Sequence, residues 1–127
     1  MGRKARTIAV DFDGVIASWS GWKGAAKIDP PIEGAREFLL KIKALGHKIM
    51  IFSARADEQA GRSGIIAYMQ KHDLAYDSMW CGKGKPDAAV FIDDRAITCR
   101  PQFNDFAYER ALEGIDHIVE NGTKVKK

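Results

Sequence analysis

The chain has 127 residues and a mass of 14.1 kDa, so we expect residues 1–127 to form a single domain. Apolar residues make up 46% and charged residues 29%, which excludes a disordered chain, and no apolar run reaches the ~18 residues of a membrane span. A net charge of +3 is too small to indicate nucleic-acid binding by itself. Two cysteines cannot form a disulfide framework, and the N-terminus does not have the pattern of a signal peptide. The expected compartment is therefore a reducing cytoplasm.

Four apolar segments are expected to be strands, at residues 7–10, 48–52, 78–81 and 89–92. The first, second and fourth are continuously apolar instead of alternating with polar residues. That pattern is typical of strands buried on both faces of a parallel sheet.

Helical patterns separate and follow these strands. Apolar residues recur at helical spacing between residues 32 and 45, and Gly46 is suited to end that helix. Asp57 is predicted to cap a helix that runs to about His72, and Asn104 to cap the last one, whose apolar stripe begins at Ala107. The resulting order predicts an α/β fold, a three-layer sandwich with a mainly parallel central sheet.

Residues 16–30 join the first strand to the first helix and are longer than an ordinary connection in such folds. They contain two tryptophans, Trp19 and Trp22, together with two glycines and a proline. We expect this segment to form a short flap over the carboxyl edge of the sheet.

Polar residues gather where the predicted strands end. They are Asp11 and Asp13 after the first strand, Ser53 after the second, Lys83 and Lys85 before the fourth, and Asp93 and Asp94 after it. Ligands of open α/β sheets bind at this edge. Four carboxylates close together would repel one another unless a cation lay among them, and oxygen ligands suit Mg²⁺. A hard cation, basic groups and a carboxylate nucleophile together indicate phosphoryl transfer.

Each of these residues also has an ordinary structural explanation when it is taken singly. An aspartate at a strand end often forms a turn, a serine such as Ser53 often caps a helix, and a lysine is usually solvated. The prediction therefore depends on their joint occurrence, in this order and at strand ends.

Four stretches, IAVDFDGVIA, IMIFSAR, GKGKP and VFIDDRA, resemble the four motifs of the haloacid dehalogenase (HAD) superfamily. The resemblance covers about residues 7–98. It implies a Rossmann-like fold and a Mg²⁺-dependent phosphatase that hydrolyses phosphomonoesters. The gaps between the motifs are short, so the chain looks most similar to the small members of the superfamily that lack a cap domain.

The resemblance also implies a role for each matching residue. Asp11 would be the nucleophile that forms an aspartyl-phosphate, and Asp13 would protonate the leaving oxygen and then deprotonate the hydrolytic water. Ser53 would bind the transferring phosphoryl group by a hydrogen bond. Lys85 would neutralise that group, with Lys83 as the second candidate because the spacing from lysine to the acidic pair is short.

The metal ligands follow from the same resemblance. Asp93 and Asp94 would hold Mg²⁺ together with the Asp11 carboxylate and the backbone carbonyl of Asp13. The sequence leaves open which member of the Asp93–Asp94 pair would contact the ion directly.

Several further residues have two interpretations. Arg55 and Arg95 flank the second and fourth motifs, where they could bind a substrate phosphate or pair with the acidic residues. Trp19, Trp22 and Lys23 could stack on and attract a nucleotide, or they could pack the flap onto the domain.

The alternatives to an enzyme are a receiver-like phosphate- or metal-binding module and an inactive HAD-like one. In a receiver domain the acceptor aspartate follows the third strand, whereas in this chain the serine precedes the last acidic pair. A toprim-like metal domain acting on nucleic acid is a further alternative, but its acidic motifs would come in the reverse of the order found here. The expected partner is a phosphorylated substrate, either small or macromolecular, with a nucleotide or a nucleic-acid end included. A neighbouring subunit could cover the open site, and no membrane partner is expected.

Overall fold

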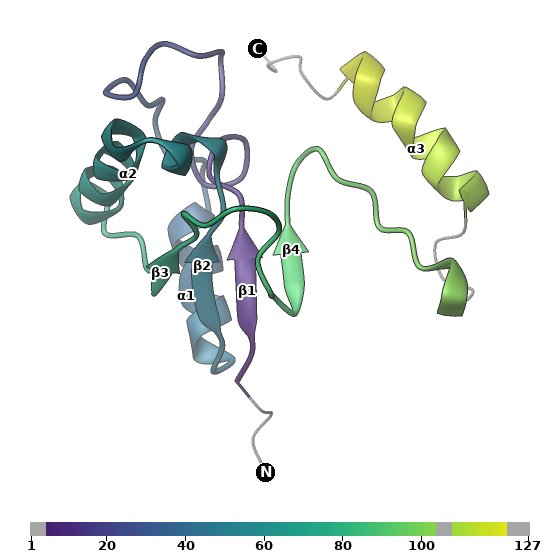
Figure 1. Ribbon diagram of the computed structural model, residues 1–127. Coiled ribbons are helices and arrows are strands. Elements are labelled where there is room, and N and C mark those ends of the chain that lie inside the picture. The colour runs from purple at the N-terminus through teal and green to yellow at the C-terminus, as the bar shows by residue number, and fades with distance from the viewer. Residues whose placement is uncertain (1–4, 104–107, 122–127) are drawn as a thin grey trace. The chain divides into compact units, whose positions relative to one another are not determined.

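The computed structural model describes residues 5–103 and 108–121, and the chain divides into two compact units. One unit ends at Asp93 and contains the sheet, and the other begins at Asp94 and contains the last helix. The single domain that the length suggests stays a prediction. The elements, in chain order, are β1 (Thr7–Val10), α1 (Ala35–Ala44), β2 (Lys48–Ile51), η1 (Ala54–Asp57), α2 (Gln59–Lys71), β3 (Ser78–Met79), β4 (Val90–Ile92), η2 (Pro101–Phe103) and α3 (Tyr108–Asn121) (Figure 1).

The sheet has four parallel strands in the order β3-β2-β1-β4, so β1 lies between β2 and β4 (Figure 1). Val10 at the end of β1 pairs with Ile51 of β2 and Ile92 of β4, which brings three strand ends into register. The apolar runs of β1 and β2 are buried, as expected of central parallel strands. The predicted α/β class with a parallel sheet is confirmed, and the described residues contain no cap domain.

The outer strand β3 is shorter than predicted, because only Ser78 and Met79 pair with β2. Trp80 still donates its backbone N–H to the Ile51 carbonyl at 2.8 Å, and the chain then leaves the sheet. The preceding Asp77 anchors this edge: its carboxylate accepts from the Ile49 amide at 2.7 Å and from the Lys43 ammonium at 2.8 Å.

The two crossover helices cover apolar faces as their spacing predicts. The helix α1 buries Leu39 and Ile42, and Gly46 follows it with a φ of +89°, which is the left-handed conformation that ends a helix. The helix α2 buries Ile65 and Met69. Together with the central strands these side chains form the core of the unit.

The predicted cap of α2 is wrong. Asp57 is the last residue of η1, and α2 begins after Glu58, which has an extended backbone and makes no side-chain capping bond. The reason is the additional turn of η1, which is capped by Ser53: its hydroxyl oxygen accepts from the Arg55 amide at 3.2 Å. The chain thus starts its capped turn four residues earlier than the sequence pattern indicated.

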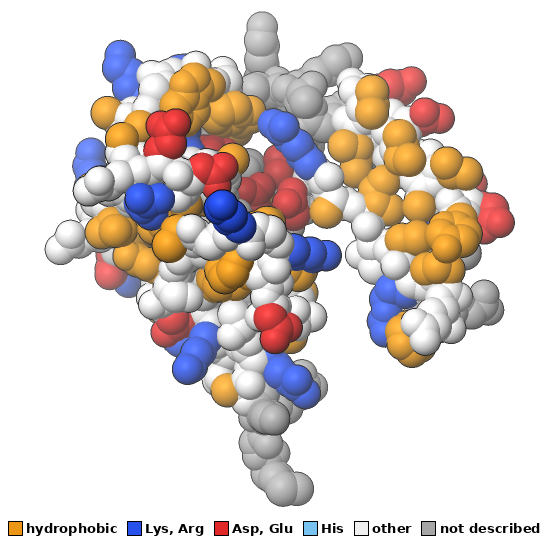
Figure 2. Space-filling view, in the orientation of Figure 1, with side chains coloured by type: hydrophobic (Ala, Val, Ile, Leu, Met, Phe, Trp, Pro, Cys, Tyr) orange, Lys and Arg blue, Asp and Glu red, His pale blue; other side chains and the backbone are white. Residues whose placement is uncertain are grey.

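The second unit consists of a loop, η2 and the helix α3. The predicted cap Asn104 and the first stripe residue Ala107 lie outside the described residues. Within the unit, Gly114 of α3 faces the side chain of Ile97. Large apolar side chains of α3 are exposed, Val119 by 71% (Figure 2). Among the described residues, no helix has the length and apolar character needed to cross a membrane.

Candidate functional site

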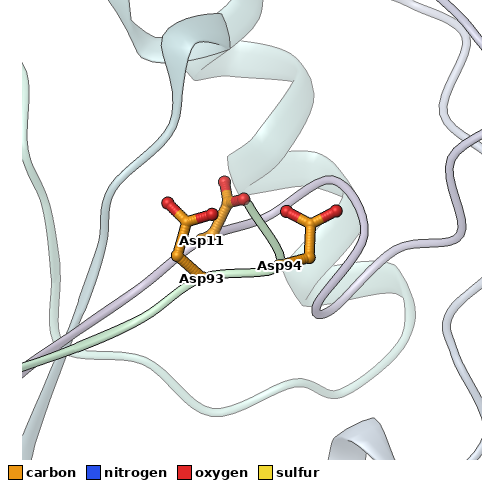
Figure 3. Close-up of side chains that lie close together, drawn as sticks. All are labelled: Asp11, Asp93 and Asp94. Atoms are coloured by element: carbon orange, nitrogen blue, oxygen red, sulfur yellow. The ribbon is translucent and has the colours of Figure 1, made fainter. Parts of the chain in front are cut away.

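Three of the four predicted acidic residues come together at the carboxyl ends of β1 and β4. Asp11 follows β1 and donates its backbone N–H to the Ile92 carbonyl at 2.9 Å, so the two strand ends stay in register. One carboxylate oxygen from each of Asp11, Asp93 and Asp94 lies within 4.8 Å of the others, and Figure 3 shows the three side chains on the same side of the strand ends. Asp11 is half-buried, whereas Asp93 and Asp94 are exposed. An all-oxygen group of this kind fits a hard cation such as Mg²⁺.

A tight turn after β1 sets the direction of the fourth acidic residue. The Asp11 carboxylate accepts from the Phe12 amide at 2.8 Å, and the Phe12 carbonyl accepts from the Ile16 amide at 2.9 Å. Gly14 occupies the left-handed region at a φ of +86°, where a residue with a side chain is disfavoured. The buried Phe12 ring fixes this turn in the core, and the carboxylate of Asp13 in the same turn bonds to Arg55 of η1.

Asp13 pairs with Arg55, as one of the two interpretations of that arginine predicts. The Arg55 Nε donates to the Asp13 Oδ2 at 2.7 Å, and the arginine is only 7% exposed. The Asp13 Oδ1 and the Arg55 Nη1 are also buried, and neither has a hydrogen-bond partner within the described part of the chain. The ion pair is therefore a buried element of the site, and Oδ1 is the carboxylate oxygen that remains uncommitted.

Ser53 lies at the end of β2, next to the Asp11 turn, because the Phe52 amide donates to the Val10 carbonyl at 2.9 Å. Its hydroxyl oxygen caps η1, which is the ordinary structural role. The hydroxyl hydrogen is a separate donor, so capping leaves Ser53 able to donate to a ligand.

The two candidate lysines lie in the loop between β3 and β4, and both are exposed. Gly84 separates them, and its carbonyl accepts from the Trp80 indole at 3.1 Å. The Lys85 ammonium lies 4.7 Å from the centre of the Phe91 ring, on the strand that carries the acidic pair. The contact places Lys85 beside β4, and the choice between Lys85 and Lys83 stays a prediction.

The flap closes at its base and rests on α2. The Ser18 amide donates to the Pro30 carbonyl and the Ile32 amide to the Ile16 carbonyl, both at 2.9 Å, so residues 16–18 and 30–32 form a small antiparallel ladder. The Tyr68 hydroxyl of α2 donates to the Asp29 carbonyl at 2.7 Å. The flap is thereby a folded part of the domain.

Lys23 has a partner inside the flap. Its ammonium lies 3.2 Å from the Asp29 carboxylate, which also accepts a hydrogen bond from the Ser20 hydroxyl. The bonds from Ser20 and Lys23 lower the pKa of Asp29. In this structure Lys23 therefore contributes to holding the flap together.

The flap tryptophans both face Arg55. Its guanidinium carbon lies 4.8 Å from the centre of the Trp22 ring and 5.9 Å from that of Trp19. This is the flap-packing arrangement, although Trp22 is still 61% exposed. Arg95 directly follows the acidic pair in the sequence and is exposed.

Sequence reasoning missed the contribution of α2 to the site. A Cβ atom added to Gly61 would lie 1.8 Å from the Arg55 carbonyl oxygen, and one added to Gly64 would lie 2.7 Å from the Ala25 carbonyl oxygen. Two glycines within a helix, three residues apart, are the signal that could have indicated a close backbone approach.

One comparison with known proteins bears on the fold. No family model matches the chain, and no curated protein matches it. A solved structure of a conserved protein from Bacteroides thetaiotaomicron is 25% identical, with a TM-score of 0.59, and the match covers 96% of this chain and 94% of that one. A structural-genomics target from Vibrio cholerae is 24% identical, with a TM-score of 0.48, over 88% of this chain and 98% of that one. The Bacteroides structure supports the small parallel α/β fold described above, and its description names no activity.

Proposed function

We propose that this chain is a Mg²⁺-dependent phosphomonoester hydrolase in which Asp11 forms an aspartyl-phosphate. The observation that carries the proposal is the approach of Asp11, Asp93 and Asp94 at the ends of two adjacent strands. Three carboxylates this close repel one another unless a cation offsets their charge. The resemblance of the four sequence motifs to HAD phosphatases supports the same reaction.

Asp93 and Asp94 would hold Mg²⁺ with the Asp11 carboxylate and the Asp13 backbone carbonyl. When bound, the ion would offset the negative charge of a phosphoryl group. Lys85 would add a second positive charge, and the Ser53 hydroxyl would donate a hydrogen bond to a phosphoryl oxygen.

The chemistry at the protein's own groups has two steps. An oxygen of Asp11 attacks phosphorus, the bond from phosphorus to the leaving oxygen breaks, and Asp13 gives that oxygen a proton. Water then attacks phosphorus and gives a proton to Asp13, and the bond from phosphorus to Asp11 breaks. Asp13 returns to its starting state, so the protons balance over the cycle.

The substrate in this proposal is a phosphate monoester, either small or the end of a macromolecule. Because the described residues contain no cap domain, the bound substrate would itself contribute to excluding water from the acidic cluster. The proposal includes a reducing cytoplasmic compartment, in which the free and exposed Cys81 and Cys99 stay reduced.

The test is a phosphate-ester panel, comprising an aryl phosphate, a mononucleotide, a 5′-phosphorylated oligonucleotide and a sugar phosphate, assayed with Mg²⁺ and with excess chelator. We expect Mg²⁺-dependent turnover that Asp11→Asn reduces by on the order of 10³-fold or more. Asp73→Asn is the matched control, because Asp73 is exposed in an ion pair with Arg36 and its φ of +55° suits asparagine.

Full activity in chelator would contradict the metal assignment, and an Asp11→Asn rate near that of the wild type would contradict the nucleophile. Mg²⁺ binding measured by calorimetry, without turnover of any ester, would replace the enzyme with the receiver-like or inactive binding module.

A further inference from the structure

Arg55 is the one charged residue with a buried side chain among the residues that the structure describes. A buried arginine is costly unless its charge is paired and its donors are satisfied. Here the pairing comes from Asp13, at 2.7 Å. Three aromatic rings surround the guanidinium, with ring centres 6.0 Å away for Phe12, 5.9 Å for Trp19 and 4.8 Å for Trp22.

The backbone of Arg55 is held as closely as its side chain. Its amide donates to the Ser53 hydroxyl oxygen, and its carbonyl contacts α2 at Gly61, where a Cβ atom has no room. With the backbone fixed from two sides and the guanidinium enclosed by rings, few rotamers of Arg55 remain accessible.

This enclosure determines how Asp13 presents its carboxylate. Arg55 engages Oδ2, and the buried Oδ1 has no other hydrogen-bond partner within the described part of the chain. A carboxylate held at one oxygen turns the other in a defined direction, and proton transfer requires that the donor and acceptor be aligned.

We propose that Arg55 is a positioning residue for Asp13 and that Trp19 and Trp22 of the flap hold Arg55 in place. The flap then belongs to the proton-transfer machinery, instead of serving as a stacking platform for a substrate base. The inference rests on the proposed function, because Asp13 transfers a proton only in that reaction. It assigns the exposed Trp22 a task that does not depend on the substrate.

Steady-state kinetics separate the two roles of the flap. A sugar phosphate has no aromatic group, whereas a mononucleotide has one. If the flap positions Arg55, its variants should lose the same fraction of kcat on both substrates; if it stacks on a base, only the mononucleotide should be affected. We expect Trp22→Ala and Arg55→Leu to lower kcat about 10- to 100-fold on both substrates, with KM changed less than about threefold. Trp22→Phe and Arg55→Lys, which keep a ring and a charge, should recover part of kcat. A rise in KM for the mononucleotide alone, with kcat unchanged, would overturn the inference.

A second readout needs no activity. In a Trp80→Phe background the fluorescence comes from the two flap tryptophans, and trypsin cleavage after Lys23 and Lys27 reports opening of the flap. We expect Arg55→Leu and Asp13→Ala each to shift the emission and to increase this cleavage several-fold.

Arg36→Leu is the matched control for the second readout, because it removes an arginine whose ion pair with Asp73 is equally short, at 2.7 Å, but exposed. It should leave emission and flap cleavage unchanged. Wild-type emission and cleavage in both Arg55→Leu and Arg55→Lys would overturn the inference, whatever the activity of the chain. The chain could lack phosphatase activity while Arg55→Leu and Asp13→Ala still change the emission and the flap cleavage. That result would refute the proposed function and support the coupling of the flap to Arg55 and Asp13. Circular dichroism verifies that each variant is folded.

Discussion

Replacing Gly61 by alanine tests how closely α2 approaches Arg55. In an unobstructed helix interior, alanine is favoured over glycine by about 1 kcal/mol. At Gly61, however, the new Cβ atom would lie 1.8 Å from the Arg55 carbonyl oxygen, whereas an ordinary contact begins at 3.4 Å. Backbone would have to move by about 1.6 Å, the difference between these two distances, to relieve the clash. Overpacking costs typically 1–3 kcal/mol and occasionally more, so we expect a net loss of about 2 kcal/mol.

Thermal and urea unfolding measure this loss. For a chain of this length, 2 kcal/mol corresponds to a fall in Tm of about 6–10 °C. Ala67→Gly, at an exposed position of the same helix, should lower the unfolding free energy by about 1 kcal/mol. This loss would show that the intrinsic helix propensities of alanine and glycine affect the stability of α2. Gly114→Ala in α3 should be tolerated, since the nearest atom is the flexible end of Ile97 at 3.1 Å. A Gly61→Ala protein as stable as the wild type, or more stable, would refute the close approach of α2 to Arg55.

Three further changes test the fold and its dependence on pH. Burial raises the pKa of Asp77, but interactions that include the hydrogen bond from Lys43 outweigh burial, so the pKa is lowered overall. Asp77→Asn should therefore cost about 1 kcal/mol of unfolding free energy. This loss should be present above pH 3.8 and vanish as the pH falls through the lowered pKa; a loss that persists in acid would contradict the ion pair. Burial raises the pKa of Tyr68 to about 12, so the stability from its neutral hydroxyl is complete below pH 10.0 and declines as the pH rises toward about 12. Tyr68→Phe should remove that alkaline slope from the unfolding free energy, and an unchanged slope would exclude Tyr68 as its source. Leu39→Ala, at a fully buried position, should cost about 2–5 kcal/mol in urea unfolding, and a loss below about 1 kcal/mol would show that Leu39 is not in the core.

The sequence alone indicated the class of sheet and the strand ends at which acidic residues meet. The strands β1 and β2 are continuous apolar runs, and a run of this kind is stable only when it is buried on both faces. Parallel strands end at one edge, so Asp11 and Asp93 could be expected to meet once both strands had been recognised. Gly46 could also be assigned from sequence, because the left-handed turn after a helix depends on a local backbone preference. The apolar runs and Gly46 are recognised from residues within or next to the feature itself, whereas the meeting of Asp11 and Asp93 also depends on the common edge of parallel strands.

Only the tertiary structure decided how the flap, the Asp11 turn and α2 fit together. Asp13 and Arg55 are 42 residues apart, and the sequence allowed Arg55 to bind either a substrate or an acid. Their pairing depends on burial, which makes an unpaired guanidinium costly and leaves Asp13 as its partner. The start of α2 was misassigned for a related reason, because Ser53 caps an additional turn before the helix. Long-range contacts select among locally acceptable conformations, and a local pattern in the sequence does not encode that choice.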